Sequence, residues 1–239
     1  MHPSGLRDLT CVFRTRTMMD TEAPAIPAIP AIPAVPAIPA SRRSDKVRDD
    51  GRKMLSVASG SPVKQVAGSI AHTARDNDFP PLLSAVGPAS VNQAVKAIAI
   101  ARTYLESDLI DLMVRVERCS SEEIKDLFVF NLIKIPSQKH NELPIDEENV
   151  TNLKSARASG TNLLAGALSK NIRDDKVVKI TSVGQTPVFR AVDSIITARK
   201  FLEEDNIDIE FQPEFTHVSF SNGQSANAIQ MVVTKIADM

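Results

Sequence analysis

The residues best suited to bind a ligand in this sequence lie where a glycine precedes a predicted helix. Gly87 follows an apolar run and comes directly before Pro88, Ala89 and Ser90, where the helix is predicted to begin. Free backbone N–H groups at a helix N-terminus attract phosphates, and glycine lets a phosphate approach the backbone closely. Gly87 therefore has two interpretations, a phosphate contact or a simple turn between a strand and a helix.

Polar side chains continue along the same predicted helix. Asn92 and Lys96 are four positions apart and share one helix face, from which asparagine can contact base or sugar edges and lysine can neutralise a phosphate. The other interpretation is a solvated polar edge on an otherwise apolar helix. Gln93 follows Ser90 with the S-x-x-Q spacing of a capping box, so it has either a capping role or a binding role.

An arginine near the end of this helix occurs twice in the chain, because Arg102 recurs as Arg199. Such a repeated arginine can bind phosphate, or it can pair with a nearby acid such as Asp108 or Asp205. The ion pair is the favoured interpretation, and Arg102 remains a candidate for nucleic-acid contact.

Catalytic and metal chemistry find little support in the sequence. Its 4 histidines show no metal-ligand spacing, and 2 cysteines are too few for a disulfide scaffold or a cysteine-rich zinc site. The chain has no P-loop, no G-x-G-x-x-G and no G-x-S-x-G motif. We therefore expect a protein that is not an enzyme and that uses no cofactor or metal.

The candidate residues belong to a unit that occurs twice. SVNQAVKAIAIARTYL at 90–105 recurs as PVFRAVDSIITARKFL at 187–202, an offset of 97 residues. Self-similarity of this kind indicates a duplicated structural unit. The repeats predict two domains, 54–136 and 151–239, joined by an acidic linker at 137–150.

Each repeat predicts the element order β-α-β-α-β-β, an α/β sandwich with two helices on one sheet face. Ser61 and Pro62 provide a capping residue and a proline for the start of the first helix. The helix at 90–105 carries two apolar stripes, and only one of them can face its own sheet. The other stripe must be covered either by the first helix of the same unit or by a partner unit, in the same chain or in another.

Residues 1–53 predict a disordered, Ala/Ile/Pro-rich tail and a basic arm. A proline at every third position of Ala25–Pro39 prevents helix and sheet, which favours a stiff polyproline II spacer or a docking motif for an aromatic groove. The segment 41–53 is either a solvated linker or an arm that contacts phosphates. The expected contacts in this arm are Arg42, Arg43, Lys46, Arg48, Arg52 and Lys53.

The amino-acid composition limits the classes of protein to which the chain can belong. A 43% hydrophobic content supports a globular core, and no run approaches the roughly 20 apolar residues that a membrane helix needs. A net charge of −1 is unlike that of a strongly basic nucleic-acid-binding domain, so any such binding must come from a local patch. The N-terminus lacks the apolar run of a secretory signal, so we expect an intracellular protein of the cytoplasm or nucleus, with organelle import as an alternative.

The first unit resembles the stage V sporulation protein S family of bacteria. The resemblance covers most of 54–136 and rests on VAGSIA, on the strand that ends at Gly87 and on SVNQAVKAIAIAR. The second unit keeps the skeleton but replaces the polar residues of the helix, and its VGQTPVFRAVDSIITARKFL is more similar to the Alba superfamily of DNA- and RNA-binding proteins. The replacements for Asn92, Gln93 and Lys96 are Phe189, Arg190 and Asp193.

The resemblance implies two tandem Alba-like domains, which in these families commonly dimerise and are taken to bind nucleic acid. Two such units in one chain resemble a built-in dimer. The family tends to carry a lysine after the first strand, where this chain has Gly60, whereas the second unit offers Lys154 and Arg157 near that place and Arg190 on its helix. The proline tract and the tandem arrangement lie outside the bacterial pattern, so a sporulation role is not carried over.

We therefore expect a non-enzymatic protein that binds RNA or DNA and whose units pair internally or form a homodimer. The alternative is a structural or assembly protein that uses the apolar helix surface of the same fold for protein partners. The near-neutral charge and the altered second unit favour this alternative.

Overall fold

The computed structural model describes residues 46–47, 51–119, 126–137, 149–220 and 223–236. The predicted tail, most of the basic arm and most of the acidic linker lie outside these residues. One compact unit runs from residue 45 to residue 239, and both repeats belong to it.

Both repeats have the predicted order β-α-β-α-β-β, which confirms the fold class. The first repeat consists of β2 (Lys53–Val57), α1 (Val63–Asp76), β3 (Leu82–Val86), α2 (Gly87–Leu105), β4 (Ile110–Cys119) and β5 (Leu127–Pro136). The second consists of β6 (Val150–Ser155), α3 (Thr161–Arg173), β7 (Val177–Ser182), α4 (Gln185–Leu202), β8 (Ile209–Ser219) and β9 (Ser225–Lys235). Short 3-10 turns follow the long helices, at η1 (Glu106–Asp108) and η3 (Glu203–Asp205). A two-residue strand within the predicted arm, β1 (Lys46–Val47), pairs with β2.

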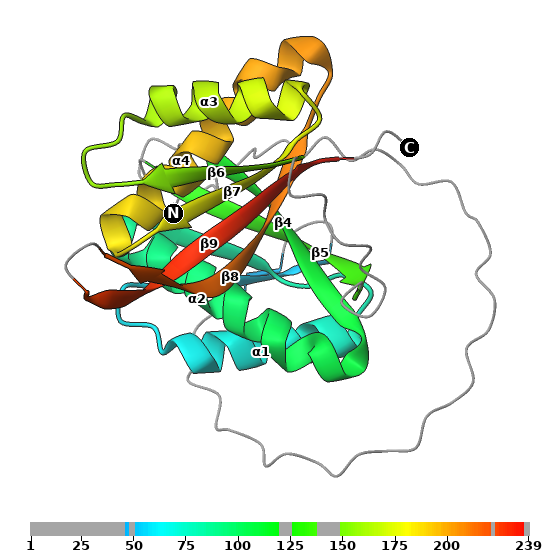
Figure 1. The fold of residues 1–239 in the computed structure, drawn as a ribbon. Helices are drawn as coiled ribbons and strands as arrows, with labels where there is room; N and C mark the ends of the chain where they lie inside the picture. Colours follow the sequence, from blue (N-terminus) through cyan, green and yellow to red (C-terminus); the bar gives the residue numbers. More distant parts are fainter. Residues whose placement is uncertain (1–45, 48–50, 120–125, 138–148, 221–222, 237–239) are drawn as a thin grey trace, which may run out of the picture. The chain divides into compact units, whose positions relative to one another are not determined.

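The strands form a single sheet in the order β1-β2-β3-β5-β4-β8-β9-β7-β6 (Figure 1). The two repeats meet at β4 and β8, where Val114 pairs with Phe211 in an antiparallel bridge. These two residues are equivalent in the repeat, since they are 97 positions apart. A pairing between equivalent positions is the mark of an isologous interface, so an approximate two-fold axis relates the repeats at this point.

One apolar core extends through both repeats. On α2 the predicted stripe of Val91, Ala94, Val95, Ile98 and Leu105 is fully buried. This helix packs against α1 of its own repeat and also against α4 of the other repeat. Figure 1 shows α1 beside α2 in one part of the fold and α3 beside α4 in another. The helix α2, which has two apolar stripes, thus packs against one helix of each repeat, α1 and α4.

The predicted helix caps are wrong. The helix α2 begins at Gly87, three residues before Ser90, and no side chain caps it. Gly87 has φ +79, a conformation that glycine adopts without strain, and Pro88 has the φ that a helix start needs. The chain therefore turns directly from β3 into α2. Ser61 likewise does not cap α1, because its Oγ accepts a hydrogen bond from the N–H of Ala58.

The bridge between the repeats makes β8 a sensitive place for core substitutions. Phe211 is fully buried, and replacing a buried phenylalanine with alanine costs about 3–5 kcal/mol. Phe211→Ala should therefore lower the free energy of unfolding by about that amount in urea titrations. Phe215→Ala, on the same strand but 49% exposed, is the control and should cost less than about 1 kcal/mol. Equal losses in the two variants would contradict the shared core.

Candidate nucleic-acid interface

The polar residues predicted to form a binding face on α2 are only partly at the surface. Gly87 is half-buried at the helix start, and Lys96 is partly exposed. Asn92 is 3% exposed, so its side chain lies inside the protein. Of the predicted pair Asn92 and Lys96, the structure leaves only Lys96 in contact with solvent to a substantial degree.

Gln93 has a role that neither of its two interpretations included. Its Nε2 donates hydrogen bonds to the carbonyl oxygens of Ser59, at 3.3 Å, and Ser61, at 3.4 Å. In the second repeat Arg190, the equivalent of Gln93, donates from Nη1 to the carbonyl of Ser159 at 2.8 Å. Both side chains therefore hold the loop between the first strand and the first helix of their repeat.

The repeated arginines form the predicted ion pairs, but with other acids. The Arg102 guanidinium binds both carboxylate oxygens of Asp111, at 2.7 and 2.9 Å. Arg199 binds both oxygens of Asp208 in the same way, at 2.6 and 2.9 Å. The acids suggested by the sequence are Asp108 and Asp205, and these pair instead with Arg75 and Arg173. The paired Arg102 is buried and does not belong to an exposed binding surface.

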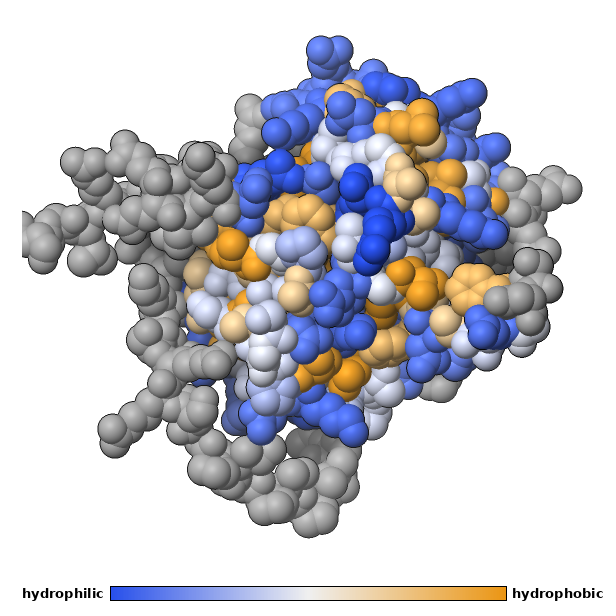
Figure 2. Space-filling model, turned by 90° about the vertical axis from the view of Figure 1, so that its left-hand side faces the viewer, coloured by the Kyte–Doolittle hydropathy of each residue, from blue (hydrophilic) through white to orange (hydrophobic). Residues whose placement is uncertain are grey.

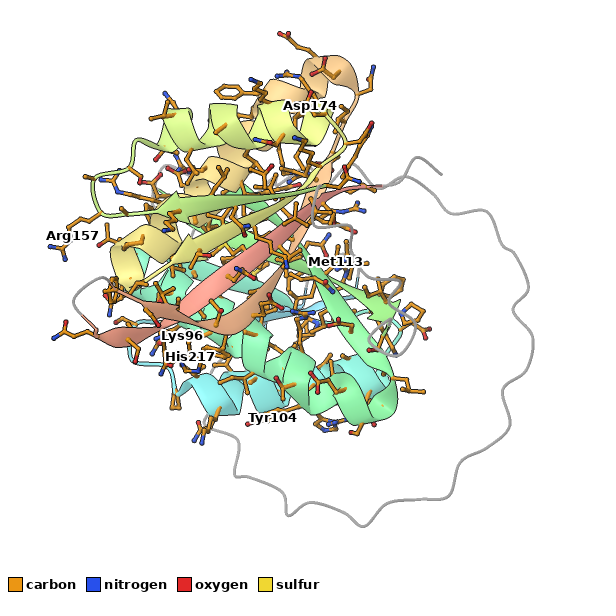
Figure 3. All side chains as sticks on the ribbon, in the orientation of Figure 1. Lys96, Tyr104, Met113, Arg157, Asp174 and His217 are labelled. Carbon is orange, nitrogen blue, oxygen red and sulfur yellow. The ribbon has the colours of Figure 1, made fainter. Side chains whose placement is uncertain are left out.

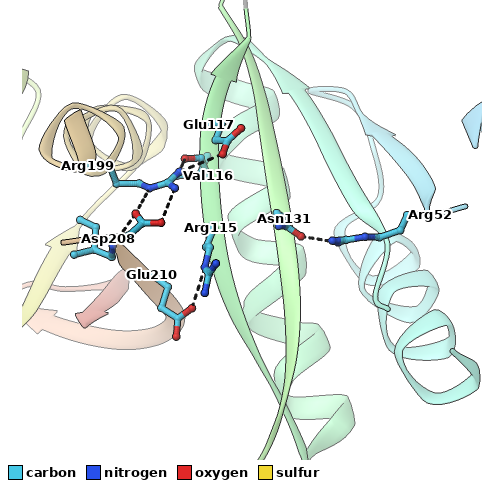
Figure 4. Close-up of polar contacts among 9 residues, drawn as sticks. Arg52, Arg115, Val116, Glu117, Asn131, Arg199, Asp208 and Glu210 are labelled. Carbon is cyan, nitrogen blue, oxygen red and sulfur yellow. Dashed lines mark hydrogen bonds and ion pairs between the residues drawn. The ribbon is translucent and has the colours of Figure 1, made fainter. Parts of the chain in front are cut away.

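Each repeated arginine also reaches across to the other repeat. Arg102 Nη1 donates to the carbonyl of Pro213 at 2.9 Å, and Arg199 Nη1 donates to the carbonyl of Val116 at 2.8 Å. Val116 and Pro213 are equivalent positions, so the approximate two-fold axis relates the two contacts to each other. Figure 4 shows the Arg199 half of this arrangement, with Asp208 and Val116.

Burial and charge compete at the carboxylates near this axis. Burial alone would raise the pKa of Asp208, but the hydrogen bonds and the charge of Arg199 outweigh it and hold that pKa below its ordinary value. Burial raises the pKa of Glu210, and Arg115, at 3.4 Å, offsets only part of this effect. Burial alone would lower the pKa of Arg199, yet its acidic partners raise it.

The second repeat contains the more open candidate site, at the N-terminus of α4. A pocket of about 840 Å³ lies between the end of β6, the start of α4 and the end of β8. Its lining residues include Lys154, Arg157, Gly184, Gln185 and Phe220. Gly184 has φ +92 and precedes the helix, as Gly87 does in the first repeat. The structure thus brings the predicted cations of the second unit to a helix N-terminus.

The two cations of this pocket are exposed, and neither has an ion-pair partner among the described residues. Figure 3 shows Arg157 extending away from the ribbon, and Figure 2 shows the same side of the molecule face on. Hydrophilic and hydrophobic residues interleave over this face. Phe220, 45% exposed, adds an aromatic surface that sequence reasoning missed, although the glycine-containing turn that follows it was a usable signal.

Such a pocket can bind an anion next to a flat apolar group. Helix N-termini and exposed cations both attract phosphate, and an exposed phenylalanine can stack on a base. No cluster of potential metal ligands occurs in the described parts of the chain. None of the helices described is long and apolar enough to cross a membrane. Of the predicted arm, Arg42, Arg43 and Arg48 lie outside the described residues, and Lys46 is placed by its backbone in β1. Arg52 donates a hydrogen bond to Asn131 at 2.6 Å, and Lys53 begins β2.

A comparison with protein families identifies the same two repeats. A family model described as Stage V sporulation protein S (SpoVS) matches residues 53–117 and residues 151–236. The matches cover both units and together more than half of the chain.

The two Arg–Asp pairs provide a matched comparison of stability. The side chains of Arg102 and Asp111 are each 9% exposed, and removing one partner of a buried pair costs about 3–5 kcal/mol. Asp111→Asn should lose about this much free energy of unfolding at pH 7. Asp208→Asn should lose less, because Asp208 is 41% exposed and solvent screens its pair.

The Asp208 comparison also depends on pH. Its pKa is lowered in the folded protein, so its stabilisation is complete above the unfolded pKa and is lost as the pH falls through the folded pKa. The difference between the wild type and Asp208→Asn should therefore fade in acid. Urea titrations at several pH values measure it, and a constant difference down to the lowest pH would refute the assignment.

Proposed function

Because the chain belongs to the stage V sporulation protein S family in both of its repeats, we propose that it is a non-enzymatic protein that binds RNA or DNA through an internal pseudo-dimer of Alba-like domains. The observation that carries the proposal is the pocket at the N-terminus of α4. Arg157 there is the one arginine of the described residues with neither an ion pair nor a hydrogen bond, and Lys154 lines the same pocket.

A nucleic-acid strand fits the chemistry of this pocket. Its phosphates can accept hydrogen bonds from the guanidinium of Arg157 and from backbone N–H groups at Gln185 and Thr186, near the start of α4. Its bases can stack on Phe220 at the end of the β8–β9 ribbon. The pocket is apolar as well as basic, which suits a ligand that carries both charge and flat rings.

The first repeat supplies the second part of the proposed surface. Lys96 is partly exposed on α2, and Figure 3 places it toward the same side of the view as Arg157. A nucleic-acid strand bound at the α4 pocket can therefore extend toward α2 and the N-terminus of that helix at Gly87. The basic arm with Arg42, Arg43, Lys46 and Arg48 stays a predicted additional contact.

An assembly function is the second candidate, and exposed apolar side chains favour it. Leu163 on α3 is 80% exposed, and Phe201 and Tyr104 near the ends of α4 and α2 are also exposed. Groups of exposed apolar residues commonly mark protein-interaction surfaces. The two candidates differ in their salt dependence, because only nucleic-acid binding rests on phosphate neutralisation.

The test is a fluorescence-anisotropy titration of the full chain with single-stranded RNA and with duplex DNA at two salt concentrations. The double variant Lys154→Glu/Arg157→Glu should bind at least about tenfold more weakly and should lower the slope of log affinity against log salt by about 1.5, for two lost phosphate contacts. The matched control is Lys170→Glu/Lys200→Glu, which changes two exposed lysines at the other ends of α3 and α4. If both double variants lose affinity equally, the pocket is not the site. If the wild type binds neither nucleic acid at low salt, the assembly function is favoured.

Lys96→Glu tests the first repeat separately. The side chain of Lys96 is partly exposed, so the variant should fold normally and lose affinity with a smaller change in salt slope, of about 0.7–0.9 for one contact. Circular dichroism checks the fold. Unchanged affinity at low salt would remove α2 from the proposed surface while leaving the α4 pocket in place.

A further inference from the structure

The contacts at the approximate two-fold axis fall into two kinds. Those of Arg102 and Arg199 largely repeat in both directions, since each arginine binds the aspartate of its own repeat and a carbonyl of the other. Of these two described residues, Arg199 alone adds an ion pair at 3.6 Å with Glu117 of the first repeat. Two first units, or two second units, would present the same groups to each other. These contacts therefore hold a pair of units together without selecting which units pair.

Besides Gln93 and Arg190, which hold a loop of their own repeat, and Thr103 and Lys200, four pairs of equivalent positions on α2, α4, β4 and β8 differ in charge between the repeats. At these positions the first repeat has three cations and no anion, whereas the second has two anions and no cation. The pairs, first repeat before second, are Lys96 and Asp193, Met113 and Glu210, Arg115 and Gln212, and Arg118 and Phe215.

Two of these differences meet in one cluster beside the axis. Asp193 on α4 pairs with Arg118 on β4 of the other repeat. Phe189, one helical turn before Asp193, packs against the ring of Phe128 with 5.1 Å between the ring centroids. The Arg118 guanidinium also lies over Phe128, at 5.3 Å from its centroid. Helix α4 thus contributes an anion that pairs with a cation of the first repeat and an aromatic ring that packs on an aromatic ring of the first repeat.

A third difference lies on the central strands. Arg115 on β4 donates to Glu210 on β8 at 3.4 Å, as Figure 4 shows. Gln212, the equivalent of Arg115, donates to Asp111 at 3.1 Å. In the first repeat this position is the cation Arg115, which faces the carboxylate of Glu210. In the second repeat it is the neutral Gln212, which faces the first repeat, where Met113 replaces Glu210.

The same positions disfavour pairing between like units. Two first units would set Arg118 against Lys96 on both sides of the axis and would place Asn92 against Phe128. Two second units would gather the carboxylates of Asp208 and Glu210 from both copies without Arg115 to offset them. Like charges that face each other across an interface disfavour that pairing, and this repulsion rejects the wrong partner.

We propose that the interface between the repeats is specific for unlike units: a first unit accepts a second unit and rejects another first unit. The partner that fits the first-repeat face is consequently the second repeat of the same chain, or that of another copy if the pair opens. Pairing therefore closes within one chain or exchanges only between unlike units.

The test uses the full chain with a protease site inserted between residues 138 and 148. After cleavage the two fragments, still together, are unfolded in urea and refolded by dilution, and native mass spectrometry counts the pairs. Unlike pairs should exceed like pairs by at least about tenfold, since a 1.4 kcal/mol preference already gives that ratio. A statistical mixture, or an excess of like pairs, would overturn the proposal.

Asp193→Lys in the same cleavable chain gives the second unit the charge of the first and should raise the fraction of like pairs at least about threefold. The matched control is Asp175→Lys, the same charge change at an exposed ion pair within the second repeat, and it should leave the sorting unchanged. Equal effects of the two substitutions would also overturn the proposal.

A second measurement avoids refolding from fragments. In the uncleaved chain, Arg118→Met and Asp193→Asn should each lower the urea midpoint, and the double variant should lower it by clearly less than the sum. Additive shifts would mean that the two side chains are not coupled, which contradicts the proposal.

Discussion

The arrangement of the two repeats depends on the hydrogen bonds of one buried arginine, Arg102 on α2, with Asp111 on β4 and Pro213 on β8. Arg102 is removed from solvent, so all of its donors need partners inside the protein. Asp111 in its own repeat satisfies two of them, and the carbonyl of Pro213 in the other repeat satisfies a third. Separating the repeats would break the hydrogen bond from Arg102 to Pro213 and expose the pair of Arg102 and Asp111 to solvent. The bridge between β4 and β8 and the shared apolar core join the repeats at the same place.

The duplication keeps the arginine contacts across the axis and the loop contacts within each repeat, and it changes charges beside the axis. Arg199 repeats the role of Arg102 with the corresponding aspartate and carbonyl. Gln93 and Arg190 differ in chemistry yet hold the same loop. At Lys96 and Asp193, by contrast, the two repeats carry opposite charges, and there the surfaces have diverged.

The element order could be predicted from the sequence because it depends on local periodicity and on the internal repeat. The apolar stripe of α2 was identified correctly for that reason. The start of α2 was placed three residues late, since a capping-box spacing at Ser90 and Gln93 competed with a turn at Gly87 whose positive φ only the structure shows. The burial of Asn92 and Arg102 could not be predicted, because α4 and β8 of the other repeat pack around α2, about a hundred residues away in the chain.

A net charge of −1 counts against nucleic-acid binding only if the charges are evenly available, and they are not. Six arginines of the described residues are held in ion pairs with acids of the same chain: Arg75, Arg102, Arg115, Arg118, Arg173 and Arg199. Each such pair removes one cation and one anion together from the field that a ligand meets. Among the described residues, Lys154 and Arg157 stay exposed and unpaired beside a helix N-terminus, so this pocket offers two cations to a ligand although the net charge of the chain is −1.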